Sequence, residues 1–335
     1  MNLASRSRPA VLLGAAISAL TCVALCAPAS ASAHTIAPAG ATAKASSSPC
    51  GTVTTAPTYK HVIVIMDENE SYSDIIGSSQ APYINSLASE CGLASNYHNI
   101  THDSLPNYLG ITSGLTYKTL LPYDEDCLPS ASCEVKGNNI FHQASSWKEY
   151  AESMPSACDK SDSGNYAPKH NPSVYYTDLS TCKTDDVPLG TASNSPLVKQ
   201  FRSESTAPAY SYLTGNLCDD MHGTTGCESG LIKAGDTWLS TWIPLITSSK
   251  VYQSGDTVIF LVWDEGAGGT TGEKCYNNTT DQSCRVPAIV IAPSVKAGTV
   301  VSTQLDHYSL LKTSEQLLGL PQIGQAKSAA SMESG

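Results

Sequence analysis

Two apolar runs of this chain each end in acidic residues, HVIVIMDENE (61–70) and TVIFLVWDE (257–265). Several carboxylates gathered in one cleft repel each other, and a hard cation relieves that repulsion because it prefers oxygen ligands. One acidic strand end alone is equally compatible with a solvated turn that caps a helix. Two such ends favour a metal site, and the side chains expected to form it are Glu68, Asn69, Asp264 and Glu265.

A third segment, HNITHDSLPNYLGITSG (98–114), places Ser104 directly before a Leu-Pro-Asn that can begin a helix. A hydroxyl there faces unsatisfied backbone N–H groups and the positive end of the helix dipole, which favour an alkoxide and an incoming phosphate. Asn107 adds a side-chain donor for a phosphoryl oxygen. An isolated serine in this position is more commonly a plain N-cap, so this motif alone leaves both interpretations open.

Three histidines lie beside Asp, Asn or Pro at expected element boundaries. His170 stands in YAPKHNP, His222 stands two residues after Asp220 in GNLCDDMHG, and His307 follows an aspartate in LDHYSLLKT. A lone histidine is more often structural than catalytic, but three at such boundaries favour a functional group.

The hydrophobic pattern alternates strands with helices. Strands are expected at 61–66, 92–97, 209–214, 257–263 and 286–292, and helices at 83–90, 106–114, 140–152, 232–248 and 307–318. Pro244 is expected to kink or split the helix that contains it. This alternation predicts an α/β sandwich with a mainly parallel sheet, in which ligands bind beyond the carboxyl ends of the strands.

The first residues are typical of an export signal. Arg6 and Arg8 precede an apolar stretch (10–27), and small residues follow at 31–33. We expect a signal peptide at 1–33, a disordered spacer at 34–49, a folded domain at 50–324 and a tail at 325–335. We therefore expect the protein to be secreted and to have no stable association with a membrane. The alternative is that the apolar stretch stays uncleaved as a membrane anchor.

Ten cysteines lie outside the predicted signal, and most form close neighbours. The expected pairs are Cys127 with Cys133, Cys158 with Cys182, Cys218 with Cys227, Cys275 with Cys284, and the remaining Cys50 with Cys91. An even count in an exported chain indicates disulfides, whereas zinc binding lacks the expected CxxC spacing. The loop-rich region at about 120–185 is expected to form a small cap pinned by such bonds.

The charge balance is strongly acidic once the predicted signal is removed. The remaining 17 basic and 30 acidic residues give a net charge of −13. Such a surface repels nucleic acid and anionic membranes, so neither is an expected partner.

Six segments, in order, resemble the bacterial phosphoesterase family of acid phosphatases and phospholipases C, within the alkaline-phosphatase-like superfamily. They are HVIVIMDENESYSDI, THDSLPNYLGITSG, KHNP, LCDDMHG, VWDEG and LDHYSLLKT. The similarity spans Tyr59 to Gly324, and Ser-Leu-Pro-Asn also resembles the nucleophile motif of nucleotide pyrophosphatase/phosphodiesterases. The resemblance implies an alkaline-phosphatase-like three-layer sandwich and a hydrolase acting on phosphoric esters.

The resemblance also implies roles for individual residues. Ser104 would be both metal ligand and nucleophile, forming a phosphoserine, with Glu68, Asn69, Asp264 and Glu265 as the other ligands. Phosphate oxygens would be held, or the leaving group protonated, by His170, His222 and His307, with Asp220 and Asn107 assisting.

One departure from the family concerns the metal. The acid phosphatases favour two aspartates where this chain has Asp264-Glu265, and two-metal relatives place a histidine there. The divalent ion is therefore left open among Ca, Zn, Mg, Mn and Fe.

Several functions compete at this stage. A small phosphate monoester is the first choice of substrate, and a phosphodiester, including a phospholipid head group, is the second. A serine esterase would need the Gly-x-Ser-x-Gly elbow that Ser104 lacks. A secreted non-catalytic binding module would leave the acids, hydroxyl and histidines without a role.

Overall fold

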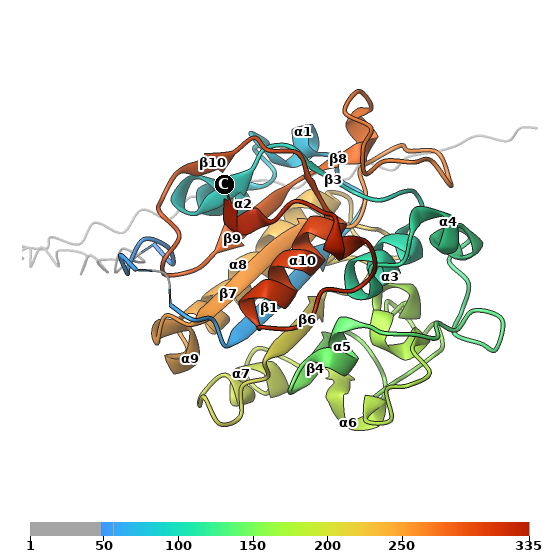
Figure 1. The fold of residues 1–335 in the computed structure, drawn as a ribbon, viewed down its shortest axis with the longest axis horizontal. Coiled ribbons are helices and arrows are strands. Elements are labelled where there is room, and N and C mark those ends of the chain that lie inside the picture. Colours follow the sequence, from blue (N-terminus) through green and yellow to red (C-terminus); the bar gives the residue numbers. More distant parts are fainter. Residues whose placement is uncertain (1–47, 56, 335) are drawn as a thin grey trace, which may run out of the picture. The chain divides into compact units, whose positions relative to one another are not determined.

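The computed structural model describes residues 48–55 and 57–334 (Figure 1). The predicted signal peptide and nearly all of the predicted spacer lie outside the described residues. Among the residues that are described, no helix combines the length and apolarity needed to cross a membrane.

An eight-stranded sheet forms the centre of the domain, in the order β10-β2-β9-β7-β1-β6-β4-β5. Its strands are β1 (His61–Asp67), β2 (Gly92–Ala94), β4 (Trp147–Ala151), β5 (Asp186–Pro188), β6 (Tyr210–Thr214), β7 (Thr257–Trp263), β9 (Ala288–Ile291) and β10 (Thr299–Val301). Strand β9 pairs antiparallel with both neighbours, and the other pairs are parallel. The sheet is therefore mainly parallel, as the sequence predicts.

A second, three-stranded sheet has the order β11-β3-β8. It consists of β3 (Tyr97–His98), β8 (Arg285–Val286) and β11 (Leu305–Asp306). The single strand expected at 92–97 is therefore divided between two sheets.

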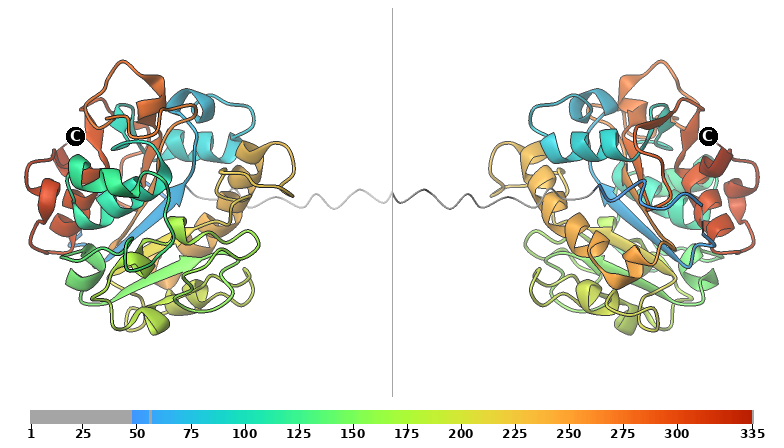
Figure 2. Two further views of the ribbon diagram at one scale, coloured as in Figure 1. Left: turned by 90° about the vertical axis from the view of Figure 1, so that its right-hand side faces the viewer. Right: turned by 90° about the vertical axis from the view of Figure 1, so that its left-hand side faces the viewer.

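Helices cover both faces of the central sheet, which gives three layers (Figure 2). Helices α3 (Ser104–Ser113) and α10 (His307–Leu317) pack together on one face, while α2 (Pro82–Glu90) and α8 (Leu231–Thr247) pack together on the other. Shorter helices are α1 (Tyr72–Ile75), α4 (Tyr117–Leu120), α5 (Ile140–Gln143), α6 (Cys182–Asp185), α7 (Pro196–Gln200) and α9 (Lys250–Gln253). Every residue of β1 and β7 is buried, as expected for parallel strands covered on both sides.

The helix predicted at 140–152 is wrong. Helix α5 ends at Gln143, and Trp147–Ala151 forms strand β4, which pairs with β6 along its whole length. Four of its five residues are buried, because the strand lies inside the sheet rather than on its surface. Tertiary pairing thus overrides a pattern that resembles an amphipathic helix.

Helix α8 continues through Pro244 without splitting and ends at Thr247. Pro244 is exposed, so water can hydrogen-bond to the carbonyl group that its missing N–H leaves free.

The five expected disulfides are all present: Cys50–Cys91, Cys127–Cys133, Cys158–Cys182, Cys218–Cys227 and Cys275–Cys284. The region 120–185 contains two of them, but it also supplies β4 to the central sheet, and β5 follows directly after it. This region is consequently built into the sandwich as well as lying beside the site.

Candidate active site

Neighbouring strands β1 and β7 bring two acidic groups to one edge of the sheet. Asp67 is in register with Trp263, so Glu68 and Asp264 both follow at the carboxyl edge. Asn69 adopts a left-handed backbone (φ 54°) and donates its N–H to Asp264 Oδ1 at 3.2 Å. Its side chain donates to Glu68 Oε2, also at 3.2 Å. Residues almost two hundred positions apart are therefore in one site.

Ser104 is buried at the first residue of α3. Its Oγ lies 3.1 Å from Glu68 Oε2 and 3.4 Å from Glu265 Oε1. The hydroxyl group thus lies between carboxylates that follow two different strands, which is the arrangement the sequence predicts. Asp103 precedes the helix, but its side chain makes no capping hydrogen bond.

His170 connects Glu68 to Asp220. Its Nδ1 lies 2.9 Å from Asp220 Oδ2, and its Nε2 lies 3.1 Å from Glu68 Oε1. Burial lowers the pKa of His170 well below its usual value, so the ring is neutral and donates from Nδ1. The lone pair of Nε2 then faces a carboxylate oxygen, and a proton or a cation between the two atoms would relieve that contact.

His222 has a neutral ring with its tautomer defined by its neighbours. Nδ1 lies 2.8 Å from the carbonyl oxygen of Gly223 and must donate, so Nε2 accepts from Lys169 Nζ at 3.0 Å. Ligand atoms of Glu68, His170 and His222 lie within 4.8 Å of one another. These three side chains form a potential metal-binding group that shares Glu68 with the predicted ligand set.

Asn107 and His307 lie near the site, but their polar atoms are engaged by other groups. Asn107 accepts from the N–H groups of Ile100 and Thr101 and donates to the carbonyl groups of Thr101 and Asp103. His307 Nε2 donates to the Asp264 carbonyl at 2.7 Å, and Tyr97 lies 3.0 Å from Nδ1. Both residues hold the main chain around the site, and their contact with phosphate stays a prediction.

The site also contains residues that the sequence motifs do not single out. Tyr108, one helical turn after Ser104, donates to Glu68 Oε1 at 2.6 Å and stacks on His170 at an interplanar angle of 7°. The sequence signal that could have identified Tyr108 is its position four residues after Ser104, on the same face of the helix. Asp67 is fully buried, and neither of its carboxylate oxygens has a hydrogen-bond partner.

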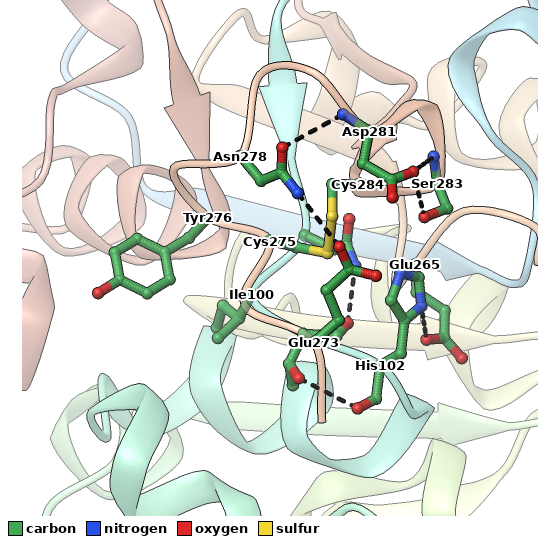
Figure 3. The surroundings of a disulfide bond; sticks show 12 residues. Ile100, His102, Glu265, Glu273, Cys275, Tyr276, Asn278, Asp281, Ser283 and Cys284 are labelled. Carbon is green, nitrogen blue, oxygen red and sulfur yellow. Dashed lines mark hydrogen bonds and ion pairs between the residues drawn. A yellow bond between two sulfur atoms is a disulfide. The ribbon is translucent and has the colours of Figure 1, made fainter. Parts of the chain in front are cut away.

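His102 contributes a buried hydrogen bond between its Nδ1 and Glu265 Oε2. The loop that carries the Cys275–Cys284 disulfide packs against it (Figure 3). Gly272 donates its N–H to the His102 carbonyl, and Cys275 donates its N–H to the Ile100 carbonyl at 2.9 Å. A Cβ atom on Gly269 would lie 2.0 Å from His102 Nε2, so only glycine fits there. This loop therefore holds the segment that leads into Ser104.

The electrostatics of the cluster favour a bound cation. Burial raises the pKa values of Asp67, Glu68 and Asp264 well above the usual carboxyl range, and mutual repulsion raises them further. Burial also raises the pKa of Asp220, to about 7. Asp264 Oδ2 has no hydrogen-bond partner, like both oxygens of Asp67. Buried oxygen atoms without donors are the groups that a divalent ion would satisfy, so the residues present fit a metal.

Comparison with known proteins identifies the family of this chain. The model of the phosphoesterase family matches residues 78–321. The chain belongs to the phosphoesterase family. A phosphatidylinositol-3-phosphatase of Mycobacterium tuberculosis is 29% identical over 277 residues, which cover 82% of this chain and 81% of that protein. An acid phosphatase of Aspergillus fumigatus is 25% identical over 270 residues, covering 77% of this chain but only 54% of the fungal protein.

Solved structures show the same fold at low sequence identity. A member of the alkaline phosphatase superfamily from Vibrio parahaemolyticus has a TM-score of 0.55 at 12% identity, covering 85% of this chain and 73% of that one. Murine ectonucleotide pyrophosphatase/phosphodiesterase 5 has a TM-score of 0.51 at 11% identity, covering 79% and 96%. The phosphoesterase-family chain is a phosphate-ester hydrolase with an alkaline-phosphatase-like fold.

Proposed function

We propose that this phosphoesterase is a secreted, metal-dependent phosphomonoesterase of the acid phosphatase type that acts through a phosphoserine. The observation that supports this most directly is the position of Ser104 Oγ between Glu68 and Glu265 at the start of α3. The hydroxyl is the one nucleophilic group of the predicted set, and its neighbours are bases.

Ser104 attacks phosphorus in line with the departing alcohol. One of its two flanking carboxylates accepts the hydroxyl proton, since Ser104 Oγ lies within hydrogen-bonding distance of both. As the new O–P bond forms, the bond between phosphorus and the alcohol oxygen breaks. Water then hydrolyses the phosphoserine and regenerates the hydroxyl group.

The departing alkoxide takes its proton from a histidine. We assign this role to His222 in its protonated form, in which Nε2 carries a proton and exchanges its contact with Lys169 for the leaving oxygen. His222 is partly exposed, whereas His307 is fully buried and its ring nitrogens lie against the Asp264 carbonyl and Tyr97. His170 instead lies between Glu68 and Asp220 and is itself oriented by the hydrogen bond from its Nδ1 to Asp220.

A divalent ion would be held by Glu68, Asn69, Ser104, Asp264 and Glu265, and it would lower the pKa of the hydroxyl and screen the phosphoryl charge. Asp264 Oδ2, which has no hydrogen-bond partner, supports this assignment. Secretion is supported by the N-terminal signal pattern and by the five disulfides.

A phosphodiesterase or phospholipase C activity is the second candidate function. The Mycobacterium relative is named for an inositol-lipid monophosphate, which favours the monoester over the diester for this chain as well.

A parallel assay decides between the two. Phosphate release from an aryl monophosphate and aryl release from a bis-aryl phosphate are measured after chelation and with each of the five candidate ions. We expect a metal-restored rate that is higher on the monoester. A higher rate on the diester would assign the second function, and no turnover of either compound with any ion would reject both.

A further inference from the structure

Asp126 connects two hydrogen-bond donors beside the nucleophile. Its Oδ1 accepts the backbone N–H of Leu105 at 2.9 Å, and its Oδ2 lies 2.7 Å from Lys169 Nζ. Leu105 directly follows Ser104 in the first turn of α3. Asp126 comes from the segment after α4 and lies directly before the Cys127–Cys133 disulfide, in a left-handed conformation (φ 51°). A carboxylate from a distant loop therefore reaches the helix start that carries the hydroxyl group.

Lys169 brings positive charge into a site that otherwise gathers acids. Its side chain is only 19% exposed, and its charge acts on Glu68 and Asp264. Burial alone would lower the pKa of Lys169, but the nearby carboxylates outweigh burial and raise it, so the ammonium group stays charged. Two of its three N–H donors serve Asp126 and the neutral His222, which leaves a donor for a further oxygen.

The two donors that Asp126 engages are those that would recognise a phosphoryl oxygen. A backbone N–H in the first helical turn and an ammonium group both favour an anion, and the carboxylate already bound there shows that the geometry accepts one.

We propose that Leu105 N–H and Lys169 Nζ each receive a non-bridging oxygen of the substrate, and that Asp126 occupies this position until the substrate displaces it. The inference rests on the proposed function, since it takes Ser104 as the nucleophile. Lys169 becomes a specificity-determining residue, and Asp126 an internal competitor.

The charge of the substrate decides how well it competes. A phosphate monoester dianion attracts the ammonium group of Lys169 more strongly than a singly charged diester does, so the subsite favours monoesters. Asp126 is partly exposed and can move outwards. Because only the open fraction of molecules binds, Asp126 lowers the apparent affinity for every anion by that fraction.

Calorimetric titration of inorganic phosphate into the metal-loaded protein tests this without catalysis. We expect Asp126→Asn, which keeps an oxygen for Leu105 but loses the charge, to bind phosphate about three- to tenfold more tightly. Lys169→Met should bind it at least about tenfold more weakly. Matched controls are Glu134→Gln and Lys160→Met, an ion pair of 3.8 Å that lies outside the site. The controls should leave the affinity unchanged.

The double variant Asp126→Asn/Lys169→Met guards against misfolding, since it leaves no unpaired charge. It should bind phosphate at least about tenfold more weakly than Asp126→Asn alone. Equal affinities of these two would remove Lys169 from the subsite. Unchanged or weaker binding by Asp126→Asn would overturn the competitor role, because Asp126 would then merely position Lys169.

Kinetics give a second measurement. Lys169→Met should reduce kcat/KM more for the aryl monophosphate than for the bis-aryl phosphate, and an equal reduction would contradict the role in specificity. The failure of the proposed function is separate. It would appear as turnover retained by Ser104→Ala, whereas the subsite is judged by phosphate affinity in variants that keep Ser104.

Discussion

Two groups of buried acids among the described residues differ in what surrounds their oxygen atoms. The site cluster comprises Asp67, Glu68, Asp220, Asp264 and Glu265. The support pair comprises Glu149 of β4 and Asp186 of β5, which are in register across neighbouring strands. All seven side chains are buried, and burial raises the pKa of each, to about 8 for Asp186.

Neutral donors engage three of the four carboxylate oxygens of the support pair, and Glu149 Oε1 has none. Asn171 donates to both oxygens of Asp186, at 3.2 and 3.0 Å, and Ser173 donates its N–H to Glu149 Oε2 at 3.0 Å. These donors belong to the segment that follows Lys169 and His170. The support pair therefore anchors the segment that carries Lys169 and His170, and its carboxyl groups can accept these hydrogen bonds while they are protonated.

The site cluster instead leaves both oxygens of Asp67 and one of Asp264 without donors. A histidine nitrogen also faces a carboxylate there, at 3.1 Å. Equally buried acids thus differ in the partner that suits them. The support pair suits a proton, and the site cluster suits a cation together with the substrate. Substitutions in the site cluster should change activity, and those in the support pair should change stability.

The largest effect is expected from Ser104→Ala. Loss of the nucleophile should reduce kcat for phosphate release by about a thousandfold or more. The free energy of unfolding should change by only about 1 kcal/mol, since one hydroxyl group at a helix start is removed. Ser113→Ala is the matched control at the other end of α3, where the hydroxyl donates to Leu109. A wild-type rate in Ser104→Ala would remove this residue from the nucleophile role.

Asp264→Asn should weaken metal binding and activity together, by about a hundredfold. The metal-free variant should be as stable as the metal-free wild type or more so, because one source of repulsion is gone. Metal titration and urea unfolding measure the two effects. Glu315→Gln is the control, since Glu315 is buried in α10 and accepts from Ile323. Activity lost at full metal occupancy would argue against Asp264 as a ligand.

Tyr108→Phe should lower kcat/KM by about tenfold, which corresponds to one hydrogen bond to a charged group. The donor to Glu68 Oε1 is lost while the ring that stacks on His170 remains. Tyr212→Phe is the control, because this hydroxyl group is buried nearby without a partner. Equal rates in the two variants would show that Glu68 does not depend on a neutral donor.

The smallest effect on activity, within about threefold, is expected from Asp186→Asn. Its effect on the pH dependence of stability should be clear. The folded state holds a proton on Asp186 up to a pKa of about 8, whereas the unfolded chain releases it near 3.8. The free energy of unfolding of the wild type should therefore fall as the pH rises through this interval, by an amount of the order of a few kcal/mol.

Urea unfolding between pH 4 and pH 8 checks this, with the difference between wild type and Asp186→Asn isolating the support pair. A saturating concentration of metal should reduce the part of the pH dependence of the free energy of unfolding that comes from the site cluster, and should leave the part from the support pair unchanged. Parallel curves for the two proteins would show that Asp186 is ionised in the folded state.

The strand-end rule explains why much of the site follows from the sequence. Glu68 and Asp264 each follow an apolar run, and parallel strands end at a common edge, so their proximity needs no further information. Ser104 follows from its place at a helix start. The hydrophobic pattern of the sequence also predicts the long buried strands and the helices that cover both faces of the sheet.

Other features depend on long-range contacts that no local pattern records. Trp147–Ala151 becomes a strand only because β6 lies beside it. Asp126 and Lys169 are 43 positions apart; Lys169 lies in the KHNP motif, where only His170 is given a role, and Asp126 lies in no motif. His102 lies in the serine segment, but its partner Glu265 is 163 positions away. In each of these cases the role comes from the neighbour that folding supplies.

The complete burial of α3 has a consequence for amide hydrogen exchange. All ten of its residues are buried, and a Cβ atom on Gly110 would lie 2.2 Å from Ile100 Cδ1, so the helix has no room to shift. Its interior amides should exchange only when the whole domain unfolds, whereas amides around the partly exposed Asp126 should exchange through local opening. The serine thus lies on a segment of long exchange lifetime, and the loop opposite it supplies the motion that admits a substrate.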